Sequence, residues 1–162
     1  MVGTGNINNM KKFSQWFFAL LFFFAAVVYV FPFKKDVKVE NVQNVNYVKI
    51  GNTELKVEIV STNEKRAKGL SGRKELKENE GMLFVFDKLA KNYFWMKEMN
   101  FPLDIIWFDQ NKKIIYLEKN VLPSSYPKSF GSDFDSQYVL EVSAFFSDRN
   151  NLKIGDFISF LP

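Results

Sequence analysis

Residues 47–59 read YVKIGNTELKVEI, and this stretch indicates the kind of fold that the chain adopts. Its two halves flank Gly51 and Asn52, a pair that favours the tight turns of β-hairpins. From residue 55 to residue 59, apolar and polar residues alternate, so one face of this segment is apolar and the other is polar. The stretch therefore predicts a β-hairpin that packs one face against a core.

The chain on the C-terminal side of this hairpin predicts further short strands with one short helix among them. Ser61 and Glu64 have the spacing of a capping box, which predicts a helix over 64–70. Apolar runs bounded by turn residues predict strands at 82–86, 93–96, 103–108, 114–118, 138–142 and 157–160. Residues 122–137 are rich in Pro, Ser and Asp and predict a long loop. About eight short strands and one helix indicate a mainly β domain, either a β-sandwich or a partly closed barrel.

The N-terminal side of the chain has a different composition. Residues 16–31 are apolar without interruption, and at about 1.5 Å per residue the span 13–33 is long enough to cross a bilayer core of roughly 30 Å. The small residues of a signal-peptide cleavage site are absent from its end. We therefore expect one transmembrane helix, an uncleaved signal anchor over 13–33. It separates a cytoplasmic segment, 1–12, from a tether, 34–46, and a β-rich globular domain, 47–162.

The charges beside this span predict its orientation. Lys11, Lys12 and the α-amino group stand on one side, against Lys34 and Lys35 on the other. The positive-inside rule therefore places the N-terminus in the cytoplasm and the globular domain outside it. The predicted location is the cell membrane, with the lipid bilayer as a partner of residues 13–33.

Composition excludes several classes of function. The net charge is +4, but four lysines and no acidic residue lie in residues 1–35, so 18 basic residues face 18 acidic ones over 36–162. A neutral domain gives no electrostatic reason to bind nucleic acid. The chain has no Cys and no His, which removes disulfides, thiolate metal sites and the usual acid-base side chain. We expect no metal and no cofactor.

Several short motifs carry a resemblance to a known family. In order they are RAKGL at 66–70, GMLFVF at 81–86, FWMK at 94–97, PLDII at 102–106, YVLEV at 138–142 and GD at 155–156. Over residues 55–160 the chain resembles the family catalogued as domain of unknown function 192. The resemblance implies a compact, mainly β domain of jelly-roll-like topology, often found behind an export signal or membrane anchor, and it implies no reaction. Ser71 and Glu98-Met99 depart from the commoner pattern, which has Met and Asn-Thr there.

Asp104 is the most informative single residue. In a strand it shares a face with Ile106, so it is predicted to enter an apolar face, where an unpaired carboxylate is costly. A cationic partner is therefore expected, and the candidates are Arg66, Arg73 and Lys97. Two roles remain open for Asp104, a buried ion pair that stabilises the fold and a carboxylate that binds a ligand or catalyses a reaction.

Trp95 lies in an aromatic run and is predicted to floor a binding groove, because exposed aromatic rings stack well on sugars. The predicted binding patch comprises Arg66, Arg73, Trp95, Lys97 and Asp104. The leading hypothesis is a membrane-tethered extracytoplasmic binding or accessory domain, with an envelope glycan or a membrane protein as its partner. One alternative is a carboxylate-based hydrolase of an envelope glycan or other polymer, with Asp104 paired to Glu98 or Glu141. Another is a structural partner of a second membrane protein.

Overall fold

The computed structural model describes residues 45–131 and 133–162. The predicted cytoplasmic segment, the predicted anchor over 13–33 and nearly all of the predicted tether lie outside the described residues. None of the helices within the described part of the chain has the length and apolar character that crossing a bilayer requires.

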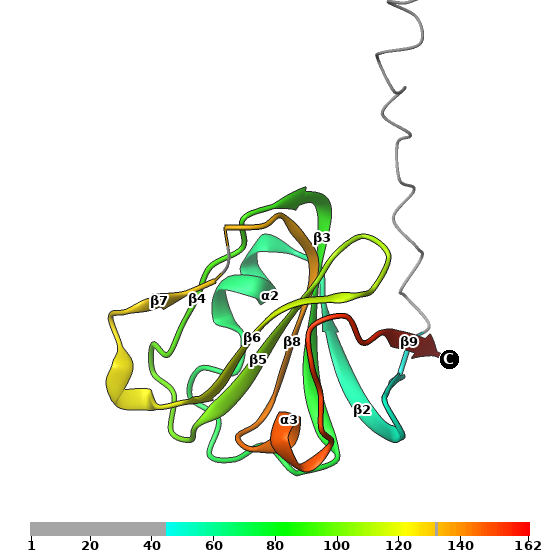
Figure 1. The fold of residues 1–162 in the computed structure, drawn as a ribbon. Helices are drawn as coiled ribbons and strands as arrows, with labels where there is room; N and C mark the ends of the chain where they lie inside the picture. The colour runs from blue at the N-terminus through cyan, green and yellow to red at the C-terminus, as the bar shows by residue number, and fades with distance from the viewer. Residues whose placement is uncertain (1–44, 132) are drawn as a thin grey trace, which may run out of the picture. The chain divides into compact units, whose positions relative to one another are not determined.

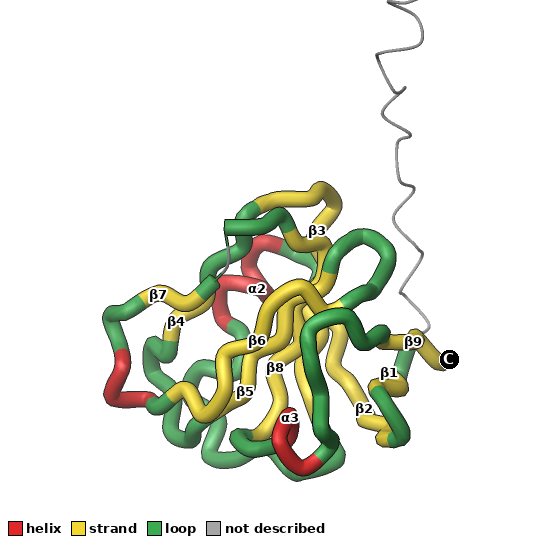
Figure 2. The backbone as a smooth tube through the Cα atoms, in the orientation of Figure 1, coloured by secondary structure: helices red, strands yellow, loops and turns green. Residues whose placement is uncertain are grey.

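The domain is mainly β, as predicted (Figure 1). Its elements are β1 (Tyr47–Ile50), β2 (Thr53–Val60), α2 (Asn63–Lys68), β3 (Glu80–Ala90), β4 (Phe94–Trp95), β5 (Leu103–Phe108), β6 (Ile114–Val121), the 3-10 helix η1 (Pro123–Ser125), β7 (Ser129–Phe130), β8 (Ser136–Ser143), α3 (Phe146–Arg149) and β9 (Ile158–Leu161). Seven strands form one sheet in the order β6-β5-β8-β3-β2-β1-β9, and β4 and β7 form a separate two-stranded ribbon. Figure 2 shows that α2 and α3 are two short helices set apart from each other among strands and loops.

The predicted hairpin is confirmed, with β1 and β2 joined by Gly51 and Asn52. The predicted helix over 64–70 is present as Asn63–Lys68, so it begins one residue earlier than predicted. Its N-cap is Thr62 and not Ser61, because the hydroxyl of Thr62 accepts the hydrogen bond from the amide of Lys65. This helix and the loop after it return the chain to the starting end of β2, so β3 pairs with β2 in parallel. The sheet is therefore mixed.

The main sheet curls into a half-barrel, which agrees with the prediction of a partly closed barrel. It is not a jelly-roll-like sandwich, because the second sheet is only the small β4–β7 ribbon. A backbone bridge between Lys113 and Phe157 brings the two ends of the curled sheet together, as does a 2.7 Å hydrogen bond from the amide of Ile114 to the carbonyl of Asp156. Sequence analysis also missed α3 and β7, which lie in segments predicted as loops or left unassigned.

The sheet has a hydrophobic core on each face. The inner core takes residues from all seven strands and from α3. The outer core takes residues from the other face and is covered by Leu70, Met96 and Phe130, from the loop after α2 and from around the β4–β7 ribbon. Strand β5 is buried along its whole length, with Trp107 in the outer core and Phe108 in the inner core. Burial on both faces explains why this strand shows no alternation of polar and apolar residues.

Candidate functional site

Asp104 is buried as predicted, but its partners are backbone amides and not a cation. One carboxylate oxygen accepts hydrogen bonds from the amides of Asn120, at 2.8 Å, and Phe145, at 3.1 Å, and the other accepts from Ser147 at 2.8 Å. Ser147 lies in the first turn of α3, where backbone amides have no partner within the helix. The expectation of a cationic partner was therefore wrong, because converging N–H dipoles satisfy a buried carboxylate as well as a charged side chain does.

The three predicted cations have other partners. The guanidinium of Arg66 donates to the carbonyl of Val85 at 2.8 Å, to the carbonyl of Ser61 and to the side chain of Asn63. Arg73 forms an ion pair with Glu58 at 2.5 Å, and the ammonium of Lys97 lies 4.0 Å from the carboxylate of Glu98. Asp104 faces the inner core, where Val142 lies opposite it in the next strand. The predicted patch is therefore divided, because Arg66 and Trp95 line one cavity, Arg73 and Lys97 do not line it, and Asp104 faces the inner core.

Glu141 is the carboxyl group with the most unusual surroundings. It lies opposite Ile105 of β5 and Met82 of β3, so it points to the outer core, and its residue surface is only 5% exposed. Its Oε2 atom has no hydrogen-bond partner among the described residues. Burial raises the pKa of Glu141 to about 8, although the positive charge of Arg73 lowers it in part. At neutral pH the carboxyl is therefore mostly protonated.

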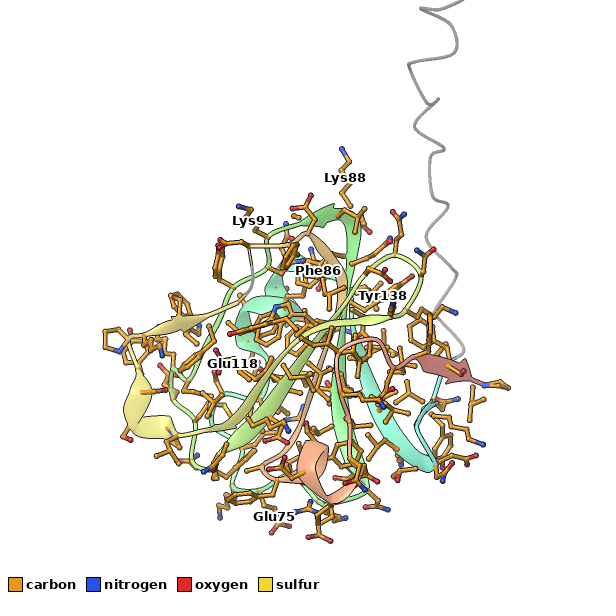
Figure 3. All side chains as sticks on the ribbon, viewed as in Figure 1. Glu75, Phe86, Lys88, Lys91, Glu118 and Tyr138 are labelled. Carbon is orange, nitrogen blue, oxygen red and sulfur yellow. The ribbon has the colours of Figure 1, made fainter. Side chains whose placement is uncertain are left out.

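A cavity of about 310 Å³ adjoins Glu141. Helix α2 and the loop after it form one wall, and the segment around β4 forms the other. The lining residues are Asn63, Arg66, Ala67, Lys68, Gly69, Leu70, Ser71, Phe84, Phe86, Asn92, Tyr93, Phe94, Trp95, Met99 and Glu141. Figure 3 shows Phe86 towards the end of β3 where Lys88 projects outward, with Lys91 just after the strand. The cavity therefore joins a buried carboxyl to a wall of aromatic side chains.

Hydrogen bonds tie the two walls together beside Glu141. The hydroxyl of Ser71 donates to the carbonyl of Lys97 at 2.9 Å, and the amide of Gly72 donates to the carbonyl of Glu98 at 2.9 Å. The side chain of Asn100 donates to the carbonyl of Arg73 at 2.7 Å. Ser71 and Glu98, two of the three positions at which the sequence departs from the commoner family pattern, thus lie in the same link between the walls.

The aromatic wall is ordered by packing. Phe94 packs edge-on against Phe84 and Trp107, with ring centroids 4.8 Å and 5.9 Å apart. Trp95, by contrast, is 53% exposed and Tyr93 is 56% exposed. Trp95 is therefore exposed at the cavity, while Phe94 beside it fixes the segment to the core.

No two of the carboxylates considered for hydrolysis form a catalytic pair. Asp104 and Glu141 project from opposite faces of the sheet, because Glu141 lies opposite Ile105 and not opposite Asp104. Glu98 is exposed beside Lys97 and does not line the cavity. Glu118 shares the outer face with Glu141, but it accepts a hydrogen bond from a tyrosine hydroxyl and also does not line the cavity. The geometry therefore gives no support to a hydrolase that pairs Asp104 with Glu98 or Glu141.

Metal-dependent chemistry finds little support in the arrangement of the acidic side chains. No group of three or more acidic side chains that could hold a metal ion occurs in the described ranges.

Sequence reasoning named Glu141 only as a partner of Asp104. The signal that could have found it is a charged residue inside the apolar run YVLEV, which predicts a carboxyl buried in a central strand.

Comparisons with known proteins agree with this fold. The model of the family described as Uncharacterized ACR, domain of unknown function 192, matches residues 46–160. The crystal structure of a protein from Sinorhizobium meliloti, described as a putative transcription regulator, is 28% identical, with a TM-score of 0.67 over 70% of this chain and 92% of that chain. A protein of unknown function from Novosphingobium aromaticivorans is 24% identical, with a TM-score of 0.67 over 80% of this chain and 99% of that chain. No curated protein matches the chain. The chain belongs to the family of domain of unknown function 192.

Proposed function

We propose that the protein is a membrane-tethered, extracytoplasmic binding domain and that its ligand site is the cavity beside Glu141. The tether and the location rest on the apolar span 13–33 and its flanking lysines. The binding site rests on the cavity geometry. An envelope glycan or a membrane protein exposed outside the cytoplasm is the partner that this location makes available.

The carboxyl of Glu141 carries the proposal, because Glu141 is buried, lines the cavity and has an oxygen, Oε2, without a hydrogen-bond partner among the described residues. Buried polar groups nearly always have their hydrogen bonds satisfied, so a poorly satisfied carboxyl at the wall of a cavity marks a place where a ligand can bind. A carboxyl whose pKa is strongly displaced by burial is also typical of functional sites. A concave site with apolar walls and a few converging polar groups is the usual form of a small-molecule site.

Binding is better supported than catalysis. Among the described residues that line the cavity, only Glu141 carries a carboxyl group. Acid-base hydrolysis of a glycosidic bond generally needs two carboxyl groups. The hydroxyl of Ser71 donates to the carbonyl of Lys97, and the chain has no His to activate it as a nucleophile.

DNA binding has no electrostatic support in this chain, although the similar Sinorhizobium protein is described as a putative transcription regulator. Residues 36–162 carry equal numbers of basic and acidic side chains. Proteins that bind duplex DNA neutralise many phosphates with Lys and Arg and therefore carry a basic surface.

A fragment screen by protein-detected NMR tests the binding site. We expect the small molecules that bind to shift amide signals of residues 66–71, 92–95 and 141 together. Ala67→Trp should abolish these shifts, because Ala67 is an exposed residue of α2 that lines the cavity and a large side chain there fills it. Ala90→Trp is the matched control, since Ala90 is also exposed but lies outside the cavity at the end of β3. Hits that map elsewhere, or that survive Ala67→Trp, would contradict the proposal.

A further inference from the structure

The cavity beside Glu141 offers hydrogen-bonding groups with little available charge. Arg66 lines it, but its guanidinium already donates to the carbonyls of Ser61 and Val85 and lies 4.9 Å from the ring centre of Phe86. Lys68 is exposed, so water screens its charge. The groups left to a ligand in the interior are therefore uncharged, which disfavours ligands that depend on a strong ion pair.

The carboxyl of Glu141 selects a particular kind of group. A protonated carboxyl both donates and accepts a hydrogen bond. Hydroxyl groups also do both, so a hydroxyl in the cavity can pair with the carboxyl of Glu141, which lines it, without requiring Glu141 to ionise. A cationic ligand would instead have to ionise a buried acid whose pKa burial has raised, and it would meet two positive side chains in the lining.

The aromatic wall of the cavity, around β4, favours a ligand that can stack the face of a ring on it. Trp95 and Tyr93 line the cavity and are each more than half exposed. The Trp95 ring contacts the Tyr126 ring edge-on, with centroids 6.3 Å apart, so a second aromatic ring supports the indole. A preformed aromatic surface lowers the entropy lost when a ligand stacks on it. The volume of about 310 Å³ is at the small end of the range for ligand pockets, about 300 to 1,000 Å³, so the ligand is small.

Building on the proposed binding function, we infer that the ligand is an uncharged saccharide residue, which stacks one face of its ring on Trp95 and places hydroxyl groups against Glu141. A free monosaccharide and the end of a glycan share this chemistry. Both present one polar ring with donors and acceptors around its edge and an apolar face of C–H groups.

Fluorine NMR of the full-length protein labelled with 5-fluorotryptophan tests this inference. The protein has three tryptophans, Trp16, Trp95 and Trp107, and Trp95→Phe assigns the signal of interest. Trp107 is fully buried in the outer core and serves as an internal control. The detergent must lack a sugar headgroup, and dodecylphosphocholine meets this condition.

Three probes share one ring and differ in charge: N-acetylglucosamine is neutral, glucosamine is a cation near pH 6 and glucuronate is an anion. We expect N-acetylglucosamine to shift the Trp95 signal, and to bind about tenfold more tightly than either charged analogue. The methyl glycoside of N-acetylglucosamine distinguishes the two sources, because binding equal to that of the free sugar indicates the end of a glycan. Binding of the free sugar alone indicates a monosaccharide.

Two variants at Glu141 separate its chemistry from its volume. Glu141→Gln keeps a donor and an acceptor without charge, so we expect affinity within about threefold of the wild type. In Glu141→Leu the apolar side chain suits the buried position, but the affinity for the sugar should fall by about tenfold or more, because the hydroxyl of the ligand is then left unpaired.

Two results would overturn the inference. One is tighter binding of glucosamine or glucuronate than of the neutral sugar, and the other is a Trp95 signal that none of the sugars moves. If the fragment screen still finds ligands blocked by Ala67→Trp, only the saccharide class is wrong and the binding function stands. If that screen also finds nothing at the cavity, both proposals fail.

Discussion

The wild-type protein should lose stability as the pH rises, and replacing Glu141 by Gln should remove most of that loss. The folded state holds this carboxyl in a buried position that raises its pKa from 4.5 to about 8, whereas the unfolded chain exposes it to water. Between these two values the folded state binds the proton and the unfolded state has released it. Because protonation and folding are linked, the contribution of this group to the free energy of unfolding is complete below about pH 4.5 and is lost as the pH rises towards 8.

The size of this loss follows from the same shift. Each pKa unit corresponds to about 1.4 kcal/mol, so the wild type should lose about 3 to 4 kcal/mol from this group between pH 5 and pH 8. That is a large part of the roughly 5 to 15 kcal/mol that stabilises a typical domain. Glutamine has nearly the same shape as a protonated glutamic acid but does not ionise, so Glu141→Gln should escape this loss.

Urea denaturation of residues 36–162, followed by tryptophan fluorescence at pH 5 and pH 8, measures the effect. Other groups also titrate in this range, so the informative quantity is the difference in pH dependence between wild type and variant. Glu75→Gln is the control, because Glu75 is an exposed carboxylate that projects from the surface (Figure 3) and should not change the pH dependence. Parallel pH profiles for wild type and Glu141→Gln would refute the reasoning, since they would mean that Glu141 is ionised and hydrated in the folded state.

Four further predictions concern other parts of the molecule. Asp104→Asn should lower the free energy of unfolding by at least about 2 kcal/mol, because an amide cannot accept from all three backbone N–H groups; an unchanged denaturation midpoint would contradict this. Gly131→Ala should lower the melting temperature, because a Cβ atom there would lie 2.5 Å from the ring of Tyr93; crystallography should show that ring displaced, and an unmoved ring would count against it. The full chain should remain in the membrane pellet after an alkaline carbonate wash, whereas residues 36–162 alone should be soluble and folded. Protease added outside spheroplasts should digest the destabilised domain, and protection there would reverse the predicted orientation.

Local patterns in the sequence were sufficient for much of the fold. The turn at Gly51 and Asn52 and the alternation after it predicted the first hairpin, because both signals act between neighbouring residues. The apolar run of β5 predicted a strand, and the charge within that run predicted that Asp104 is buried. The family motifs brought the right segments to notice, since residues of both 66–70 and 94–97 line the cavity. The anchor over 13–33 stays a prediction from the sequence.

The tertiary structure decided which groups meet. Asp104 is satisfied by amides 16, 41 and 43 residues away, and every residue except proline carries an amide, so no side-chain pattern predicts such a partner. Whether Asp104 and Glu141 could act together depended on strand register, because successive residues of a strand point to opposite faces. The curl of one sheet, rather than the packing of two, likewise followed from long-range pairing of β1 with β9 and of β3 with β8. Sequence alone determined which residues had to be buried, while pairing between distant strands decided that Glu141, and not Asp104, reaches the cavity.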